Sequence, residues 1–185
     1  SPNGLKAAVG HWGSVSLVNL QTRTVEKVLT SDLPVHVVLL TGDEWVFTFS
    51  QSRAQSIQIA TNSVRELSAT TDSSTITAAR LHASGNFAYV SLSNSYWRRL
   101  DVRNGGTPMN SSYSSIYACN NVWVSEDGQR MYTACGSVYR SSETPSEDGV
   151  PNGTLSGGVS PLRNWIAHAG ARQQIAASGG SDVQL

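Results

Sequence analysis

The two cysteines are the residues whose spacing most directly predicts chemistry. Cys119 and Cys135 flank the turn-forming sequence Ser125-Glu-Asp-Gly. In an antiparallel hairpin about that turn, the numbers of facing residues sum to about 253 or 254, and the cysteines sum to 254. The thiols then lie opposite each other or one residue out of register, within disulfide range, and such a bond requires an oxidising compartment. The sequence predicts a Cys119–Cys135 disulfide, with two buried free thiols as the alternative.

A tryptophan in a short polar turn is the first candidate for ligand binding. Trp12 lies between His11 and Gly13, directly after the apolar segment Leu5–Gly10. An indole held at the rim of a protein stacks well on a sugar ring or on a partner's side chain. His11 and Trp12 therefore form a candidate binding site, and packing of Trp12 onto a neighbouring sheet is the alternative.

A basic and aromatic cluster is the second candidate. Tyr96, Trp97 and Arg98 are followed by Arg99, and arginine stacked on an aromatic ring binds anions or carbohydrates. Alternate residues of a strand point to opposite faces, so the four side chains are not expected to converge. An ordinary solvated outer strand is the alternative.

The remaining chemically active residues predict no metal, no cofactor and no catalytic residue. His82 and His168 occupy the same position of a repeat and could meet only across a central channel. The sequence contains no HxxxH, no Cys-x-x-Cys and no alternating aspartate loop, which are the usual spacings of metal ligands. It also lacks a G-x-S-x-G nucleophile motif.

The composition limits the partners. Charged residues make up 14% of the 185 residues and the formal net charge is +0. Nucleic acids and anionic membranes require a basic surplus, so neither is an expected partner. No apolar run approaches the ~18–20 residues of a membrane span. A polar surface with few charges favours an extracellular, cell-surface or periplasmic protein.

These residues lie on a repeat of about 42 residues. Turn sequences related to Ser125-Glu-Asp-Gly begin near residues 1, 41, 83, 125 and 169, which gives steps of 40, 42, 42 and 44 residues. The segments between the turns alternate polar and apolar residues or form short apolar runs, as β-strands do. No segment shows helical spacing of apolar residues over three turns.

The expected strands follow this repeat, and residues 142–158 are expected to form the longest irregular stretch. Strands are predicted at Leu5–Gly10, Ser14–Leu20, Thr24–Leu29, Val35–Leu40, Trp45–Ser50, Gln55–Ala60, Ser63–Leu67, Ala78–His82, Phe87–Leu92, Tyr96–Val102, Gln129–Cys135, Ser137–Ser141, Asn164–His168, Gln173–Ser178 and Ser181–Leu185.

Four short strands per repeat predict an all-β fold made of four-stranded antiparallel β-propeller blades, in a single domain or fragment over residues 1–185. A blade cannot bury both of its faces alone, whereas blades packed radially bury them against each other. The nearly continuous apolar runs, such as Val35–Leu40, are expected to form the innermost strand of each blade, covered on both faces.

The order of strands and turns resembles the YVTN-type repeat of surface-layer and quinoprotein-like β-propellers. The resemblance lies in SPNGLKAAVGHWGSVSLVNLQTRTVEKVL and, more loosely, in FAYVSLSNSYWRRLDVRNGG. It implies the propeller fold, a secreted or surface setting, and a ligand face formed by the loops between second and third strands and those leading into the inner strand. That face would carry the Trp12 turn.

The resulting functional hypothesis is a non-catalytic binding or interaction propeller with a protein or carbohydrate partner at the loop rim. The alternative is a propeller enzyme or enzyme subunit of the lactonase or quinoprotein type, with a site at the channel mouth. The number of expected strands also bears on whether these residues form a complete ring. Counted by repeat as three, four, four, four and three, degraded strands included, the expected strands total 18, three more than the clear segments named above. They make about four and a half blades, so we expect further blades or a second copy to complete the ring.

Overall fold

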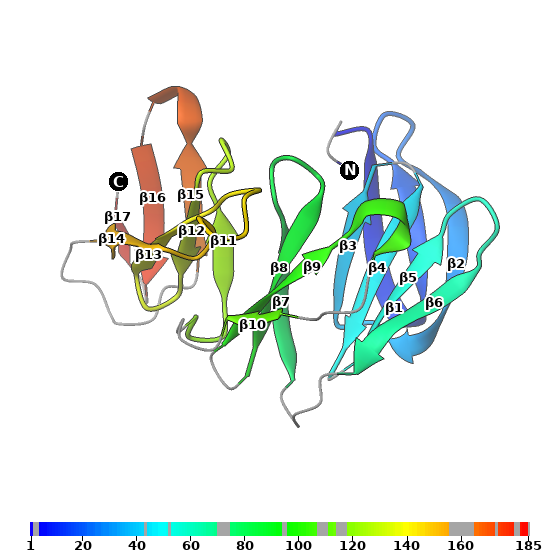
Figure 1. Ribbon diagram of the computed structural model, residues 1–185. Helices are drawn as coiled ribbons and strands as arrows, with labels where there is room; N and C mark the ends of the chain where they lie inside the picture. The colour runs from blue at the N-terminus through cyan, green and yellow to red at the C-terminus, as the bar shows by residue number, and fades with distance from the viewer. Residues whose placement is uncertain are drawn as a thin grey trace.

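The structure is a computed structural model. It describes residues 1, 4–42, 44–51, 53–69, 75–93, 96–106, 111–113, 118–155, 165–172, 174–179 and 182–184. The strands of these residues form antiparallel sheets that follow one another along the chain (Figure 1). The all-β prediction is therefore confirmed. The helical residues described are two 3₁₀ turns, η1 (Arg103–Gly105) and η2 (Gly170–Arg172), and neither has the length to cross a membrane.

Five sheets are seen in the described residues, and we number them in chain order. The first contains β1 and β2, the second β3 to β6, the third β7 to β10, the fourth β11 to β14 and the fifth β15 to β17. The strands are β1 (Lys6–Asn19), β2 (Thr24–Pro34), β3 (Val37–Thr41), β4 (Trp45–Ser50), β5 (Arg53–Gln58), β6 (Val64–Ala69), β7 (Ile76–Leu81), β8 (Phe87–Leu92), β9 (Trp97–Asp101), β10 (Ser111–Tyr113), β11 (Val122–Val124), β12 (Arg130–Thr133), β13 (Ser137–Arg140), β14 (Pro151–Thr154), β15 (Trp165–Ala169), β16 (Gln174–Gly179) and β17 (Asp182–Gln184).

The long strand β1 reverses direction within its own length. The Leu20 amide donates a 2.9 Å hydrogen bond to the Leu5 carbonyl, so the two ends of β1 lie side by side. A straight strand of 14 residues would hold them ~45 Å apart. His11 and Ser16 also share a 2.9 Å hydrogen bond, and Gly13 has a φ of 79°. The chain therefore turns at His11–Gly13, as predicted, and β1 supplies two antiparallel arms.

The core lies between successive sheets. Val15 and Leu29 of the first sheet pack with residues of the second, and Phe47 and Phe49 of the second pack with the third. Further clusters join the third sheet to the fourth and the fourth to the fifth. The first strands of the last four sheets are also in contact in series, β3 with β7, β7 with β11 and β11 with β15. The sheets are thus stacked face to face with their first strands toward a common side.

One expectation about burial is wrong. The apolar run that forms β3 is only partly buried, whereas every residue of β8 and five of six in β4 are buried. The physical reason is position in the sheet. A second strand has a hydrogen-bonded strand on each side and a packed sheet on each face, whereas the first strand leaves one edge open.

The strand boundaries agree with the sequence best in the second strands. The predicted segments Trp45–Ser50 and Phe87–Leu92 coincide with β4 and β8. The stretch 142–158, predicted to be irregular, contains the strand β14. β14 pairs only with β13 and is exposed throughout, and such an edge strand tolerates the proline and glycine that argued against it.

The predicted disulfide is confirmed, and its cysteines lie one residue out of register about the hairpin, which is one of the two arrangements expected. Cys119 and Cys135 are bonded with Cα atoms 5.6 Å apart, and the hairpin turns at Ser125–Gly128. The pairs along β11 and β12, such as Val122 with Thr133, sum to 255 rather than 254. The cysteines therefore lie beyond the paired strands, and Cys119 sits in a turn with a φ of 49°. A turn rather than a ladder brings the sulfur atoms together.

Candidate functional site

The Trp12 turn presents an aromatic ring to solvent. Trp12 is 85% exposed, which contradicts the alternative that it packs onto a neighbouring sheet. The backbone beneath it is fixed, because the Val35 amide donates a 3.3 Å hydrogen bond to the His11 carbonyl. Gly10 lies so close that a Cβ atom there would be 2.6 Å from Val35 Cγ1. A rigid, partnered turn therefore carries a free indole.

The second candidate cluster does not form one site. Tyr96 is 39% exposed, whereas Trp97 is fully buried and meets the Tyr89 ring edge-on at 4.9 Å between centroids. Arg98 is half-buried. The alternation along β9 separates these side chains, as expected, but the solvated outer strand proposed as the alternative is wrong. The burial of Trp97 removes it from the candidate binding residues.

Three exposed aromatic side chains of the described residues lie at the same end of their respective sheets, the first, the third and the fifth. Trp12 lies at the turn between the two arms of β1, and Tyr96 directly precedes β9. Trp165, which is 49% exposed, begins β15. Since strands alternate in direction, the starts of the first and third strands of a sheet share one end with the turn between the second and third. We call Trp12, Tyr96 and Trp165 the aromatic rim.

The sequence reasoning missed Trp165. It lies in the apolar segment predicted as an inner strand, and such a position indicates burial. Exposure of Trp165 follows from its place on the outward face of the fifth sheet, since Ile166 next to it points into the core. The two faces of this segment can be told apart only from the pairing of β15 with β16, which the sequence alone does not give.

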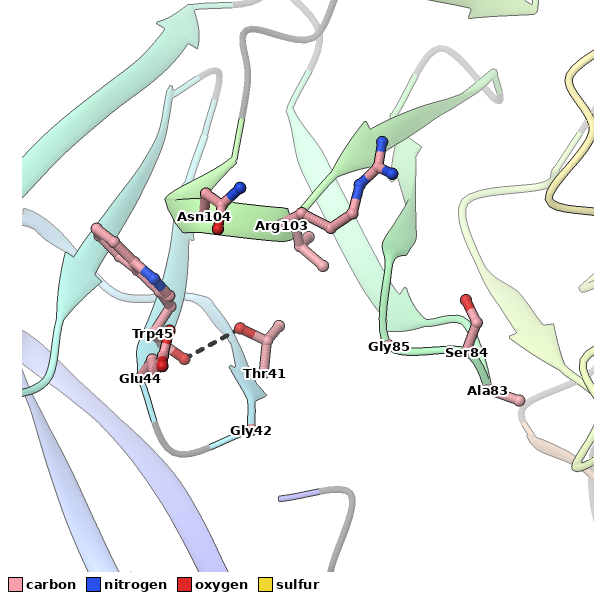
Figure 2. A pocket seen from close by; sticks show the side chains of 10 residues that line it. Thr41, Gly42, Glu44, Trp45, Ala83, Ser84, Gly85, Arg103 and Asn104 are labelled. Carbon is pink, nitrogen blue, oxygen red and sulfur yellow. Dashed lines mark hydrogen bonds between the residues drawn. The ribbon is translucent and has the colours of Figure 1, made fainter.

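The opposite end of the sheets carries an open cleft of about 480 Å³ between the second and third sheets. Figure 2 shows Thr41, Glu44 and Trp45 on one side of the cleft and Ala83 to Gly85 on the other. The hydroxyl of Thr41 donates to the Trp45 carbonyl at 3.3 Å. Arg103, at the edge, is already ion-paired with Asp101, and this pair lowers the pKa of Asp101.

A buried polar network joins the third and fourth sheets. The Asp148 carboxylate accepts hydrogen bonds from the Tyr89 hydroxyl and from the Ser142 amide, and it pairs with Arg99 at 3.0 Å. The Arg99 guanidinium lies 3.6 Å from the centre of the Phe87 ring. Burial, followed by the Asp148 charge, raises the pKa of Tyr89 and keeps its hydroxyl protonated. This network is closed on itself and holds the β13–β14 connection in place.

The two histidines of the repeat do not face each other. His82 is buried, stacks on Phe87 at 4.2 Å, and shares a 2.7 Å hydrogen bond with the Gly128 carbonyl of the next sheet. The role of His82 is therefore to join sheets. Among the described residues, no three His, Cys, Asp or Glu side chains are grouped as metal ligands would be.

Comparison with known proteins gives a likeness in fold. No protein-family model matches the chain, and no curated protein sequence matches it. A solved chain of hydrazine synthase from Kuenenia stuttgartiensis is similar, with a TM-score of 0.70 and 18% identity. The match covers 96% of this chain and 53% of that chain, so this chain spans about half its length. The likeness is structural. At this identity it carries the arrangement of the sheets and not the activity.

Proposed function

We propose that the five sheets are blades of a β-propeller of the YVTN type that acts as a non-catalytic binding module. The order of four antiparallel strands per repeat and the contact between successive first strands support this architecture. The similar hydrazine synthase chain belongs to a protein that contains a β-propeller, which supports it as well.

The exposed ring of Trp12 is the observation that carries the binding function. A large aromatic side chain is usually buried, and leaving it in water forgoes ~2 kcal/mol of hydrophobic stabilisation. A rigid turn that nevertheless presents the indole keeps it preorganised for a ligand, since binding then orders little additional chain. His11 is exposed beside Trp12; its Nε2 is bonded to Ser16, and its Nδ1 is the ring nitrogen offered to a ligand.

A carbohydrate is the partner that this chemistry favours. The apolar face of a sugar ring stacks on an indole while its hydroxyls bond to neighbouring polar groups. The chain has no net charge to attract an ionic ligand. The disulfide between Cys119 and Cys135 supports a setting outside the reducing cytosol, namely extracellular, cell-surface or periplasmic, where polysaccharides are available.

Affinity electrophoresis through gels that contain xyloglucan, mixed-linkage β-glucan or dextran tests the proposal. Retardation in one of these gels is expected, and Trp12→Ala should weaken it about 30-fold, the ~2 kcal/mol of a hot-spot residue. Because Trp12 is 85% exposed, the melting temperature should not change. Val64→Ala, which removes an exposed side chain outside the aromatic rim, is the control.

Two results would count against this function. Retardation that Trp12→Ala leaves intact would remove the Trp12 turn as the site. Migration unaffected by all three polysaccharides, together with specific binding of a protein that Trp12→Ala abolishes, would replace the carbohydrate by a protein partner at the same rim.

A further inference from the structure

The outward face of the first sheet carries several valines around Ser16, and none of the described residues of the other sheets covers it. The hydrogen bond between Leu20 and Leu5 sets the register of the two arms of β1, so that Val9 lies beside Ser16. Ser16 in turn pairs with Val28 of β2. Val9 and Val28 are 45% and 60% exposed and Val25, paired with Val18 on the same face, is 57% exposed. We call Val9, Val18, Val25 and Val28 the valine face.

The other face of the same sheet is fully packed. Val15, Leu17 and Leu29 alternate with the residues of the valine face and are at most 2% exposed. Ala8 packs against the same cluster, which confirms the alternation along the first arm of β1. A sheet that is apolar on both faces has the pattern of one sandwiched between two neighbours, as the second, third and fourth sheets are.

A recurring polar contact shows how neighbouring sheets are joined. Lys27 of the first sheet donates to the carbonyls of Ile59 and Ala60, which lie in the connection between the last two strands of the second sheet. Each of these contacts places a cation of one sheet on the main-chain carbonyls of the next sheet's outer turn. A hydrogen bond from a charged donor to a neutral carbonyl is stronger than one between two neutral groups.

The same arrangement occurs at the two following interfaces. Arg65 of the second sheet donates to the Asn104 and Gly106 carbonyls of the third at 3.4 Å each. Arg99 of the third donates to the Ser142 and Glu143 carbonyls of the fourth, at 2.8 and 3.1 Å. The cation always comes from the earlier sheet and the turn from the later one. The corresponding turn of the first sheet, Leu20–Arg23, is exposed.

We propose that the valine face and the Leu20–Arg23 turn bind a further antiparallel sheet of the same polypeptide, outside residues 1–185. This inference rests on the propeller architecture of the proposed function. It specifies which surface of the first sheet is bound and which side chains the neighbouring sheet carries. The neighbouring sheet carries an apolar face opposite Val9 and Val28. Its third or fourth strand carries a lysine or arginine that donates to the carbonyls of the Leu20–Arg23 turn.

A sheet of the same polypeptide fits better than a second copy of the chain. Two copies joined head to tail would bring together ten sheets, more than the roughly four to eight blades typical of a closed propeller. Figure 1 shows the first and fifth sheets at opposite ends of the described structure, so the fifth sheet does not cover the valine face. The match covers 53% of the hydrazine synthase chain, so that chain contains further residues outside the matched part.

Thiol labelling at Val28 tests the proposal. In Val28→Cys, the new thiol should react with a polyethylene-glycol maleimide as fast as that of the control Ser146→Cys when only residues 1–185 are present. Ser146 is exposed and far from the valine face in sequence. In the product of the complete reading frame, labelling of Val28→Cys should slow at least tenfold, while Ser146→Cys stays unchanged.

Three outcomes would overturn it. Equal labelling rates at both positions in the complete product would show that no further sheet covers the valine face. Protection of Val28→Cys in residues 1–185 at high concentration, with a doubled mass by light scattering, would assign the face to a second copy. A reading frame that encodes no further strands would remove the proposed neighbour. None of these results depends on carbohydrate binding at Trp12, so the two proposals fail separately.

Discussion

Removing Arg99 should destabilise the protein far more than removing an equally close ion pair at its surface. Arg99 and Asp148 are 3.0 Å apart, with side chains that are 16% and 0% exposed. Arg53 and Glu66 are also 3.0 Å apart, but 48% and 55% exposed. The two pairs share chemistry and distance, and they differ in burial. Comparing variants of the two pairs therefore distinguishes the cost of leaving a buried charge without a partner from the attraction between the two ions.

The expected loss for Arg99→Met is about 3–5 kcal/mol, because the Asp148 carboxylate is left buried without its counter-ion. The Tyr89 hydroxyl and the Ser142 amide still donate to it, but they carry no charge. At roughly 2–4 °C per kcal/mol for a chain of this size, the melting temperature should fall by about 6–20 °C. Arg53→Met should cost at most about 1 kcal/mol, as surface pairs do.

Urea unfolding monitored by circular dichroism gives both values, and the double variant Arg99→Met, Asp148→Asn identifies the cause. Asparagine keeps the shape and an acceptor but removes the stranded charge, so the double variant should recover part of the loss. A loss below 1 kcal/mol for Arg99→Met would refute the argument from burial. A double variant no more stable than Arg99→Met would show that the packing of Arg99 on Phe87, rather than the charge, accounts for the effect.

Three further predictions concern other features of the fold. Replacing both cysteines by serine should cost about 3 kcal/mol, since the disulfide closes a loop of 16 residues, and urea unfolding measures it. Burial raises the pKa of Tyr89 above its ordinary value of about 10, so the contribution of the protonated hydroxyl to stability is complete below that pH and is lost as the pH rises toward the folded pKa. Tyr89→Phe should flatten that decline in an alkaline unfolding series. Gly105→Ala should cost more than 2 kcal/mol by thermal melting, because φ is 83° and a Cβ would be 2.7 Å from the Trp45 ring; Gly42→Ala, with φ of 61° and open space, should cost only about 1 kcal/mol.

The candidate site could be predicted only in part. The Trp12 turn was found because glycine and a polar neighbour interrupt an alternating pattern, which is a local signal. Burial is not local. Trp97 and Tyr96 are adjacent in sequence, yet one is enclosed by the fourth sheet and the other faces solvent. The YVTN resemblance remains a prediction, and so does the binding function, which the electrophoresis experiment tests.

The sequence by itself determined most of the strands and the disulfide pairing. These depend on contacts between residues close along the chain, where alternation and turn chemistry act directly. Only the tertiary structure showed that no other described residues cover the valine face. Only the tertiary structure, too, showed that Arg99 reaches Asp148 and that His82 reaches Gly128. Those contacts join segments more than 40 residues apart, and each depends on how one twisted sheet stacks on the next. A short-range pattern contains no information about that stacking.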